Sequence, residues 1–101
     1  MKQLKTVKIQ QTEDFEDWFF NLTKKERLQI TARLERITAY GHFGDSKFLG
    51  DGLYELRWKN GWRLYFVMIK DTLILLVGGH KNDQEKDIKK ARINIGHYSY
   101  N

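Results

Sequence analysis

The fold of this chain is decided by residues 53–79, LYELRWKNGWRLYFVMIKDTLILLVGG, in which three apolar segments are separated by two tight turns. Leu53 to Trp58 and Arg63 to Ile69 alternate between apolar and polar side chains, and Asn60-Gly61 between them is a strong hairpin signal. A second turn leads to Thr72 to Gly79, whose apolar composition is typical of a central or covered strand. The segment therefore predicts a three-stranded meander.

The residues before this meander predict two consecutive helices. Thr12 is a good N-cap, and the acidic residues that follow it complement the positive end of a helix dipole. Thr23 and Glu26 have the spacing of a capping box that begins a second helix, which Gly41 and Gly44 end. The first helix would bury one apolar stripe and the second a line of aliphatic residues: Phe15, Trp18, Phe19 and Leu22, then Ile30, Leu34 and Ile37.

The two ends of the chain complete the expected order of elements. Leu4 to Ile9 predicts a first strand, and Asn82-Asp83 are expected to cap a last helix. One face of that helix would carry Gln84, Ile88, Ala91 and Ile95. Residues 1–101 then form a single α+β domain, β-α-α-β-β-β-α, with an N-terminal helical hairpin packed on a small, mainly antiparallel sheet. We expect the helices on one side of the sheet and a mobile tail from Gly96 to Asn101.

Composition excludes several classes of protein. The 101 residues suffice for one modest core, and a hydrophobic share of 41% indicates a folded chain. No apolar run approaches the roughly 20 residues that a membrane span needs. The chain has no cysteine, so it can form neither a disulfide nor a thiolate metal site, and its histidines are too isolated to suggest a metal cluster. We expect a cytoplasmic protein with no membrane partner, cofactor or metal.

The charge distribution favours an anionic partner. The net charge is +5, and residues 13–17 hold four acidic side chains, so the rest of the chain carries +9. Strand alternation predicts a polar cluster at the sheet surface, with basic residues at the end of the last strand: Glu55, Arg57, Arg63 and Tyr65, then His80 and Lys81. A basic and aromatic cluster of this kind suits RNA. Trp58 and Trp62, beside the hairpin turn, would either stack on bases or pin the hairpin as a cross-strand pair.

The order of these motifs resembles a known family. Residues 44–57 read GDSKFLGDGLYELR, residues 61–66 read GWRLYF, and residues 75–91 read LLVGGHKNDQEKDIKKA. This pattern is similar to that of the RelE/ParE toxins of type II toxin–antitoxin modules, and most similar to their HigB-like branch of addiction-module killer proteins. The resemblance extends from about Phe15 to Ala91.

The resemblance implies a toxin held by an antitoxin, expected to be acidic, to contain a helix-turn-helix and to be encoded next to it. It also implies a ribosome-associated endoribonuclease that cuts mRNA without a metal, by attack of the ribose 2′-hydroxyl on the adjacent phosphate. Two alternatives stay open, because the superfamily also contains gyrase inhibitors with this fold. The chain would then be either a non-enzymatic toxin that inhibits a protein target or an inactive relic that still binds antitoxin.

The endoribonuclease reading assigns roles to particular residues. Arg63 is the first choice and Arg57 the second for holding the charge of the phosphorane, because a guanidinium grips two phosphate oxygens. Glu55 is either a general base or the ion-pair partner of Arg57, and His80 is either a proton-transfer group or a surface residue. Lys47 and Lys81 are expected to contact phosphate, while Tyr65 is either a ligand contact or a core residue. Gly78-Gly79 is better explained by close backbone approach than by nucleotide binding.

Overall fold

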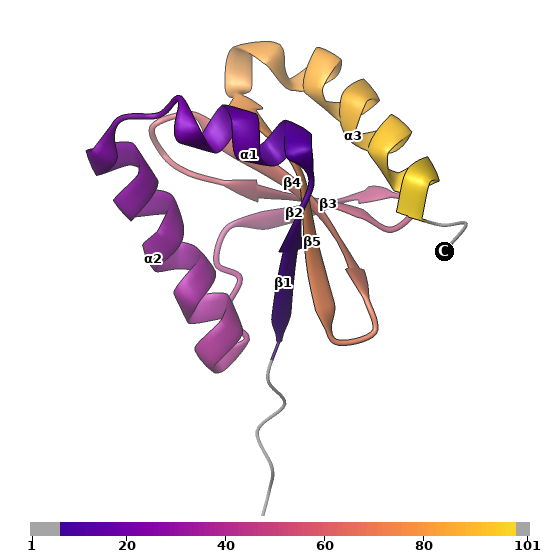
Figure 1. The fold of residues 1–101 in the computed structure, drawn as a ribbon, viewed down its shortest axis with the longest axis horizontal. Coiled ribbons are helices and arrows are strands. Elements are labelled where there is room, and N and C mark those ends of the chain that lie inside the picture. The colour runs from indigo at the N-terminus through magenta and orange to yellow at the C-terminus, as the bar shows by residue number, and fades with distance from the viewer. Residues whose placement is uncertain (1–6, 99–101) are drawn as a thin grey trace, which may run out of the picture.

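The computed structural model describes residues 7–98, which form one five-stranded sheet and three α-helices (Figure 1). The elements are β1 (Lys8–Gln11), α1 (Glu13–Phe20), α2 (Lys24–Tyr40), β2 (Ser46–Gly50), β3 (Leu53–Arg57), β4 (Trp62–Ile69), β5 (Thr72–His80), a 3-10 turn (Lys81–Asp83) and α3 (Gln84–Tyr98). The strand order is β1-β5-β4-β3-β2, and β1 runs parallel to β5 while the other pairs are antiparallel. The predicted α+β class and the meander β3-β4-β5 are confirmed.

The structure adds one strand to the predicted order. Ser46–Gly50, expected as a glycine-rich loop, pairs with β3 as the edge strand β2, with an irregular register between Phe48 and Gly50. Its side chains are mostly exposed, so this segment lacks the apolar alternation that would have marked it as a strand. Lys47 therefore lies on a strand, directly opposite Glu55 of β3.

The ends of the chain also differ from expectation. The first strand begins at Lys8 and ends at Gln11, later than predicted, and the part of the predicted strand from Leu4 to Thr6 lies outside the described residues. Helix α3 continues to Tyr98, so Gly96 is a helical residue and not the start of a tail. Residues 99–101 lie outside the described part of the chain.

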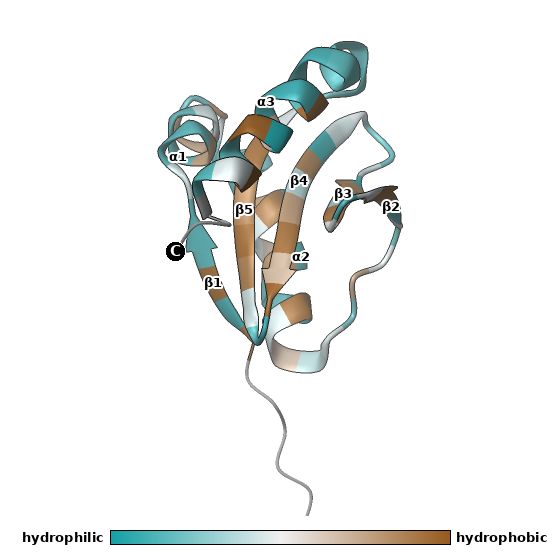
Figure 2. Ribbon diagram, turned by 90° about the vertical axis from the view of Figure 1, so that its right-hand side faces the viewer, coloured by the Kyte–Doolittle hydropathy of each residue, from teal (hydrophilic) through white to brown (hydrophobic). Residues whose placement is uncertain are grey.

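The helices cover both faces of the sheet, so the expectation that they share one side is wrong. Helices α1 and α2 pack on one face, over a core that includes Phe15, Ile30 and Phe66. Helix α3 packs on the other face, where Ala91 lies among side chains of β3, β4 and β5 (Figures 1 and 2). Strands β4 and β5 are apolar along most of their lengths because both of their faces are buried (Figure 2).

The predicted helix starts are confirmed for α1 and α2. The Thr12 hydroxyl accepts a hydrogen bond from the Phe15 amide at 3.0 Å, and Thr23 and Glu26 form the reciprocal capping box. Helix α3 begins at Gln84, directly after Asn82-Asp83 as predicted, but a 3-10 turn leads into it. Asn82 lies in the 3-10 turn, and the N-cap of that turn is His80, whose Nδ1 accepts from the Asn82 amide at 3.5 Å.

Candidate functional site

The sheet brings most of the predicted site residues onto one face. Glu55 lies opposite Tyr65, Arg57 lies opposite Arg63, and Lys47 of the edge strand lies opposite Glu55. Residues paired across neighbouring strands point to the same face, and alternation keeps residues two apart on that face. These five side chains therefore form one cluster on the face that α3 packs against.

This cluster lies much deeper than the sequence predicted. The exposed fraction is 0% for Tyr65, 1% for Glu55 and 8% for Arg63, instead of the sheet-surface position expected for all three. The side chain of Arg57 is 37% exposed, and Lys47 is exposed. Alternation correctly placed the residues on one face, but it did not reveal that α3 covers this face.

Arg63 has a structural role in this arrangement. Its Nη1 donates hydrogen bonds to the backbone carbonyls of Trp58 at 3.1 Å and Trp62 at 2.9 Å, on either side of the β3–β4 turn. Its Nε is buried and has no hydrogen-bond partner. A guanidinium held in this way braces the hairpin, and it has little freedom to close on a phosphate.

Glu55 connects the sheet to the start of α3. Its Oε2 accepts a hydrogen bond from the Gln84 side-chain amide at 2.7 Å, and its Oε1 lies 3.5 Å from the Arg57 Nε. The carboxylate is thus the buried anchor of the more exposed Arg57 guanidinium. This geometry favours the ion-pair reading of Glu55 over the general-base reading, because a base must be reachable by the proton that it abstracts.

Tyr65 cannot contact a ligand in this structure, so its phosphate-binding reading is corrected to a core position. Its hydroxyl is fully buried and makes no hydrogen bond. Burial, reinforced by the nearby Glu55 carboxylate, raises the pKa of Tyr65 above the ordinary tyrosine value. The neighbouring Phe66 is equally buried, in the core on the opposite face, so β4 is covered on both faces at this point.

The structure does not bring His80 together with Arg63. His80 lies opposite Trp62 on the face that carries α1, and the two rings meet edge to face at 5.6 Å. A Cβ on Gly61 would lie 2.4 Å from His80 Nε2, so this turn position requires glycine. His80 therefore caps the 3-10 turn and lies against the β3–β4 hairpin, away from the Glu55 cluster.

The two tryptophans beside the hairpin turn have separate surroundings. Trp58 is buried in the core, and the Arg33 guanidinium lies 4.6 Å from the centre of its ring. Trp62 packs against Trp18 of α1 at 5.8 Å. Trp58 is therefore not available to stack on bases, and the aromatic partners of Trp62 are Trp18 and His80.

The accessible part of the predicted site is a cationic end of the sheet. Arg57, Lys47 and Lys81 retain exposed side chains, and Lys81 follows β5 at the end of the sheet where the β3–β4 turn lies. Such an arrangement can bind an anion such as a phosphodiester. Within residues 7–98, no group of three His, Cys, Asp or Glu side chains could hold a metal ion, and no helix is long and apolar enough to span a membrane.

Two functional features were missed at the level of sequence. Gln84 was predicted as part of the buried face of the last helix, but its hydrogen bond to Glu55 makes it a positioning residue. Asp87, to which the sequence assigned no chemistry, is only 8% exposed and faces Gly79, where a Cβ would lie 1.9 Å from its Oδ2. The signal in the sequence was the pair of glycines just before a charged helix. The close contacts that a Cβ would make at both positions confirm that Gly78-Gly79 serves close backbone approach.

Comparison with protein families identifies the chain. The family described as phage-derived protein Gp49-like (DUF891) matches residues 17–99. This chain belongs to the Gp49-like family. An uncharacterized protein of Haemophilus influenzae is 39% identical to this Gp49-like chain over 92 residues, which cover 87% of this chain and 92% of that protein.

Solved structures show that this Gp49-like chain has the fold of the RelE toxins. A mutant of the E. coli toxin RelE in its free state superposes with a TM-score of 0.74 at 16% identity, covering 89% of this chain and 98% of RelE. The intact E. coli RelBE toxin–antitoxin complex gives a TM-score of 0.65 at 17% identity, with 73% and 95% covered. The RelB–RelE antitoxin–toxin complex of Methanococcus jannaschii gives 0.62 at 16% identity, with 75% and 94% covered.

Proposed function

We propose that this chain is the toxin of a type II toxin–antitoxin module and that it cleaves mRNA on the ribosome, with Arg57 as its main phosphate-binding residue. The observation that carries the proposal is the setting of Arg57. Its side chain is 37% exposed, while its Nε lies 3.5 Å from a Glu55 carboxylate that is itself buried and hydrogen-bonded to Gln84. The family, the RelE fold and the cationic end of the sheet support the same reading.

In this proposal the residues of the cluster have different tasks. Glu55 attracts the guanidinium of Arg57 through an ion pair with the buried Nε, which has no hydrogen-bond partner, and leaves the terminal nitrogens to bind phosphate. Lys47 and Lys81 supply further positive charge at the same end of the sheet. In 2′-hydroxyl attack, these cations would stabilise the charge that develops on the phosphorane. Gln84 keeps Glu55 in place and is a positioning residue.

The experiment is tightly regulated expression of the wild-type chain beside Arg57→Ala, with growth and cellular mRNA ends followed together. We expect growth arrest and new mRNA ends in the wild type, both lost in Arg57→Ala. Arg36→Ala, which removes an exposed arginine from α2, is the matched control and should stay active. Arg57 is a better test than Arg63, because Arg63→Ala would also remove two hydrogen bonds that brace the hairpin. Cleavage that persists in Arg57→Ala would refute the assigned role.

A second candidate function is supported by the positions of the two residues that the sequence offered for proton transfer, Glu55 and His80. Glu55 is buried, and His80 lies on the opposite face of the sheet. A toxin of this fold that inhibits a protein such as a gyrase would need no such group. Growth arrest without new mRNA ends, together with inhibition of supercoiling by the purified chain, would establish this alternative.

The proposed module requires an antitoxin partner. The chain carries +5 overall, and α2 begins with a run of basic residues, which suits an acidic antitoxin. We expect affinity between the two proteins to fall as salt is raised, measured by titration calorimetry at several ionic strengths. An affinity that does not change with salt would contradict the electrostatic part of this proposal. If co-expression with the neighbouring gene leaves toxicity unchanged, that gene is not the antitoxin.

A further inference from the structure

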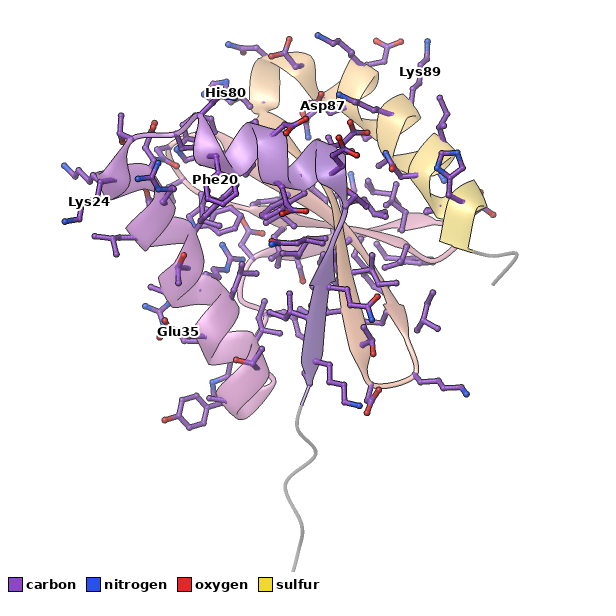
Figure 3. The ribbon with its side chains drawn as sticks, viewed as in Figure 1. Phe20, Lys24, Glu35, His80, Asp87 and Lys89 are labelled. Carbon is purple, nitrogen blue, oxygen red and sulfur yellow. The ribbon has the colours of Figure 1, made fainter. Side chains whose placement is uncertain are left out.

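A groove of about 430 Å³ lies between α1 and α3, over the last residues of β5. It is lined by Trp18 from α1, Trp62 from β4, the Gly78-Gly79 backbone of β5, Asp83 from the 3-10 turn and Asp87 from the first turns of α3. Figure 3 shows Asp87 on α3 where this helix passes α1. The groove is on the side of the molecule away from the β2 edge, and it is separate from the Arg57 site.

Asp87 is an unpartnered charged group within this groove. It is 8% exposed, and its carboxylate makes no hydrogen bond or ion pair with any described residue. A second acid of the groove, Asp14, is already paired, with Lys90 at 3.8 Å and with the Asn94 amide at 3.0 Å. Burial, with Asp83 nearby, raises the pKa of Asp87 above the ordinary carboxyl value. A buried carboxylate without a partner costs stability unless a cationic ligand satisfies it.

The backbone of β5 offers additional acceptors at the same place. Strand β1 pairs with β5 only from Thr72 to Leu75, so among residues 7–98 no strand pairs with the edge of β5 beside Val77, Gly78 and Gly79. Gly78 and Gly79 have no side chains to block the groove. A ligand with several N–H donors could therefore reach the Asp87 carboxylate beside this end of β5, where Gly79 leaves room over the strand.

We propose that this groove binds the arginine side chain of a partner polypeptide. A guanidinium carries five N–H donors, stays charged and stacks on aromatic rings, and the groove supplies a carboxylate, a backbone edge and the indoles of Trp18 and Trp62. Lysine fits less well, because its ammonium is compact and strongly hydrated. A metal ion fits less well still, because the described residues offer no set of three ligands. The groove is lined by four aspartates (Asp14, Asp17, Asp83 and Asp87) and two lysines (Lys86 and Lys90), so its excess of negative charge disfavours phosphate and nucleic acid.

The test is an NMR titration of the ¹⁵N-labelled full chain with N-acetylarginine amide, following the three tryptophan indole N–H signals. We expect saturable shifts for Trp18 and Trp62, while Trp58, buried beneath Arg33, serves as the internal control and stays unchanged. N-acetyllysine amide should bind more weakly, and the neutral isostere N-acetylcitrulline amide should not bind. Free arginine should bind more weakly than the amide, because its α-carboxylate would face the acids of the groove; equal or tighter binding would assign the site to the free amino acid.

Asp87→Asn is the deciding variant, because it keeps the shape of the side chain and removes the charge. We expect it to weaken binding of N-acetylarginine amide by about tenfold or more. Asp71→Asn makes the same charge change at the turn before β5, at the other end of that strand, and should bind like the wild type. Equal binding by Asp87→Asn and the wild type, equal binding of arginine and citrulline amides, or equal shifts of all three indoles would each overturn the proposal. The readout does not depend on RNA cleavage or toxicity.

Discussion

The two faces of the sheet are built on different physical principles. On the α1/α2 face the core is apolar, and aromatic rings stack along it, with Phe43 and Phe66 at 5.6 Å and Tyr54 and Phe66 at 5.3 Å. On the α3 face the buried side chains include Glu55, Tyr65, Arg63 and Asp87. Burying polar groups costs free energy unless each is satisfied, so the apolar residues of the α3 face, such as Leu53, Val67 and Leu76, must offset a cost that the α1/α2 face largely avoids. Costly polar burial is frequent at functional sites.

The largest expected effect tests the apolar face. Phe66→Ala should destabilise the chain by about 3–5 kcal/mol, because it removes a ring that is 1% exposed and leaves a cavity between two stacked neighbours. Urea denaturation followed by circular dichroism measures the change. A loss below about 1 kcal/mol, the size expected for a surface substitution, would show that this face is not the main source of stability.

The paired glycines allow the two faces to be compared at adjacent positions. A Cβ at Gly78 would lie 2.1 Å from the Trp18 ring, and one at Gly79 would lie 1.9 Å from the Asp87 carboxylate. We expect Gly78→Ala to cost about 3 kcal/mol, because the indole is rigid and packed against Trp62. Gly79→Ala should cost less, about 1 kcal/mol, because the carboxylate can turn into the groove. Thermal unfolding of both variants measures the difference, and the reverse order would contradict the account of the two faces.

Asp87→Asn tests whether the charge on the α3 face costs stability. The folded state raises the pKa of Asp87 above its ordinary value of 3.8, so above this pH the native protein holds a proton that the unfolded chain has released. Stability must therefore fall as pH rises through this window. We expect Asp87→Asn to match the wild type well below pH 4 and to become the more stable protein as pH rises toward 7. Denaturant midpoints of both proteins, measured across this pH range, test the prediction. A difference in stability that stays constant with pH would show that the charge of Asp87 is not the cause.

Tyr65→Phe should have the smallest effect at neutral pH. The hydroxyl is buried without a hydrogen bond, so removing it costs little and relieves an unpaired polar group. At alkaline pH the tyrosine itself lowers the stability of the wild type. The pKa of Tyr65 is raised above 10.0 in the folded state, so the native protein keeps a proton that the unfolded chain loses. Wild-type stability should fall above about pH 10, and Tyr65→Phe should lose less. Alkaline unfolding curves for the two proteins test this; parallel curves would argue against it.

The parts of the fold that follow from local chemistry were predictable. The Asn60-Gly61 turn and the caps at Thr12 and Thr23 each depend on a few neighbouring residues, and all three are confirmed. The edge strand β2 was missed because its exposed side chains carry no apolar alternation. The motif order was sufficient to identify the RelE-like fold, because a long series of spaced motifs constrains a fold more than any single motif.

The sequence by itself determined the turns, the caps at Thr12 and Thr23, the strand periodicity and the grouping of Glu55, Arg57, Arg63 and Tyr65 on one face, whereas Lys47 joined them only through the unpredicted strand β2. Only the tertiary structure decided that α3 covers that face. As a result Arg57 stays accessible while Arg63 braces a hairpin, and His80 points to the opposite side. It also placed the Asp87 carboxylate over Gly79. A two-residue period tells which side chains of a strand share a face. Whether that face is buried depends on helices from distant parts of the sequence that pack on it.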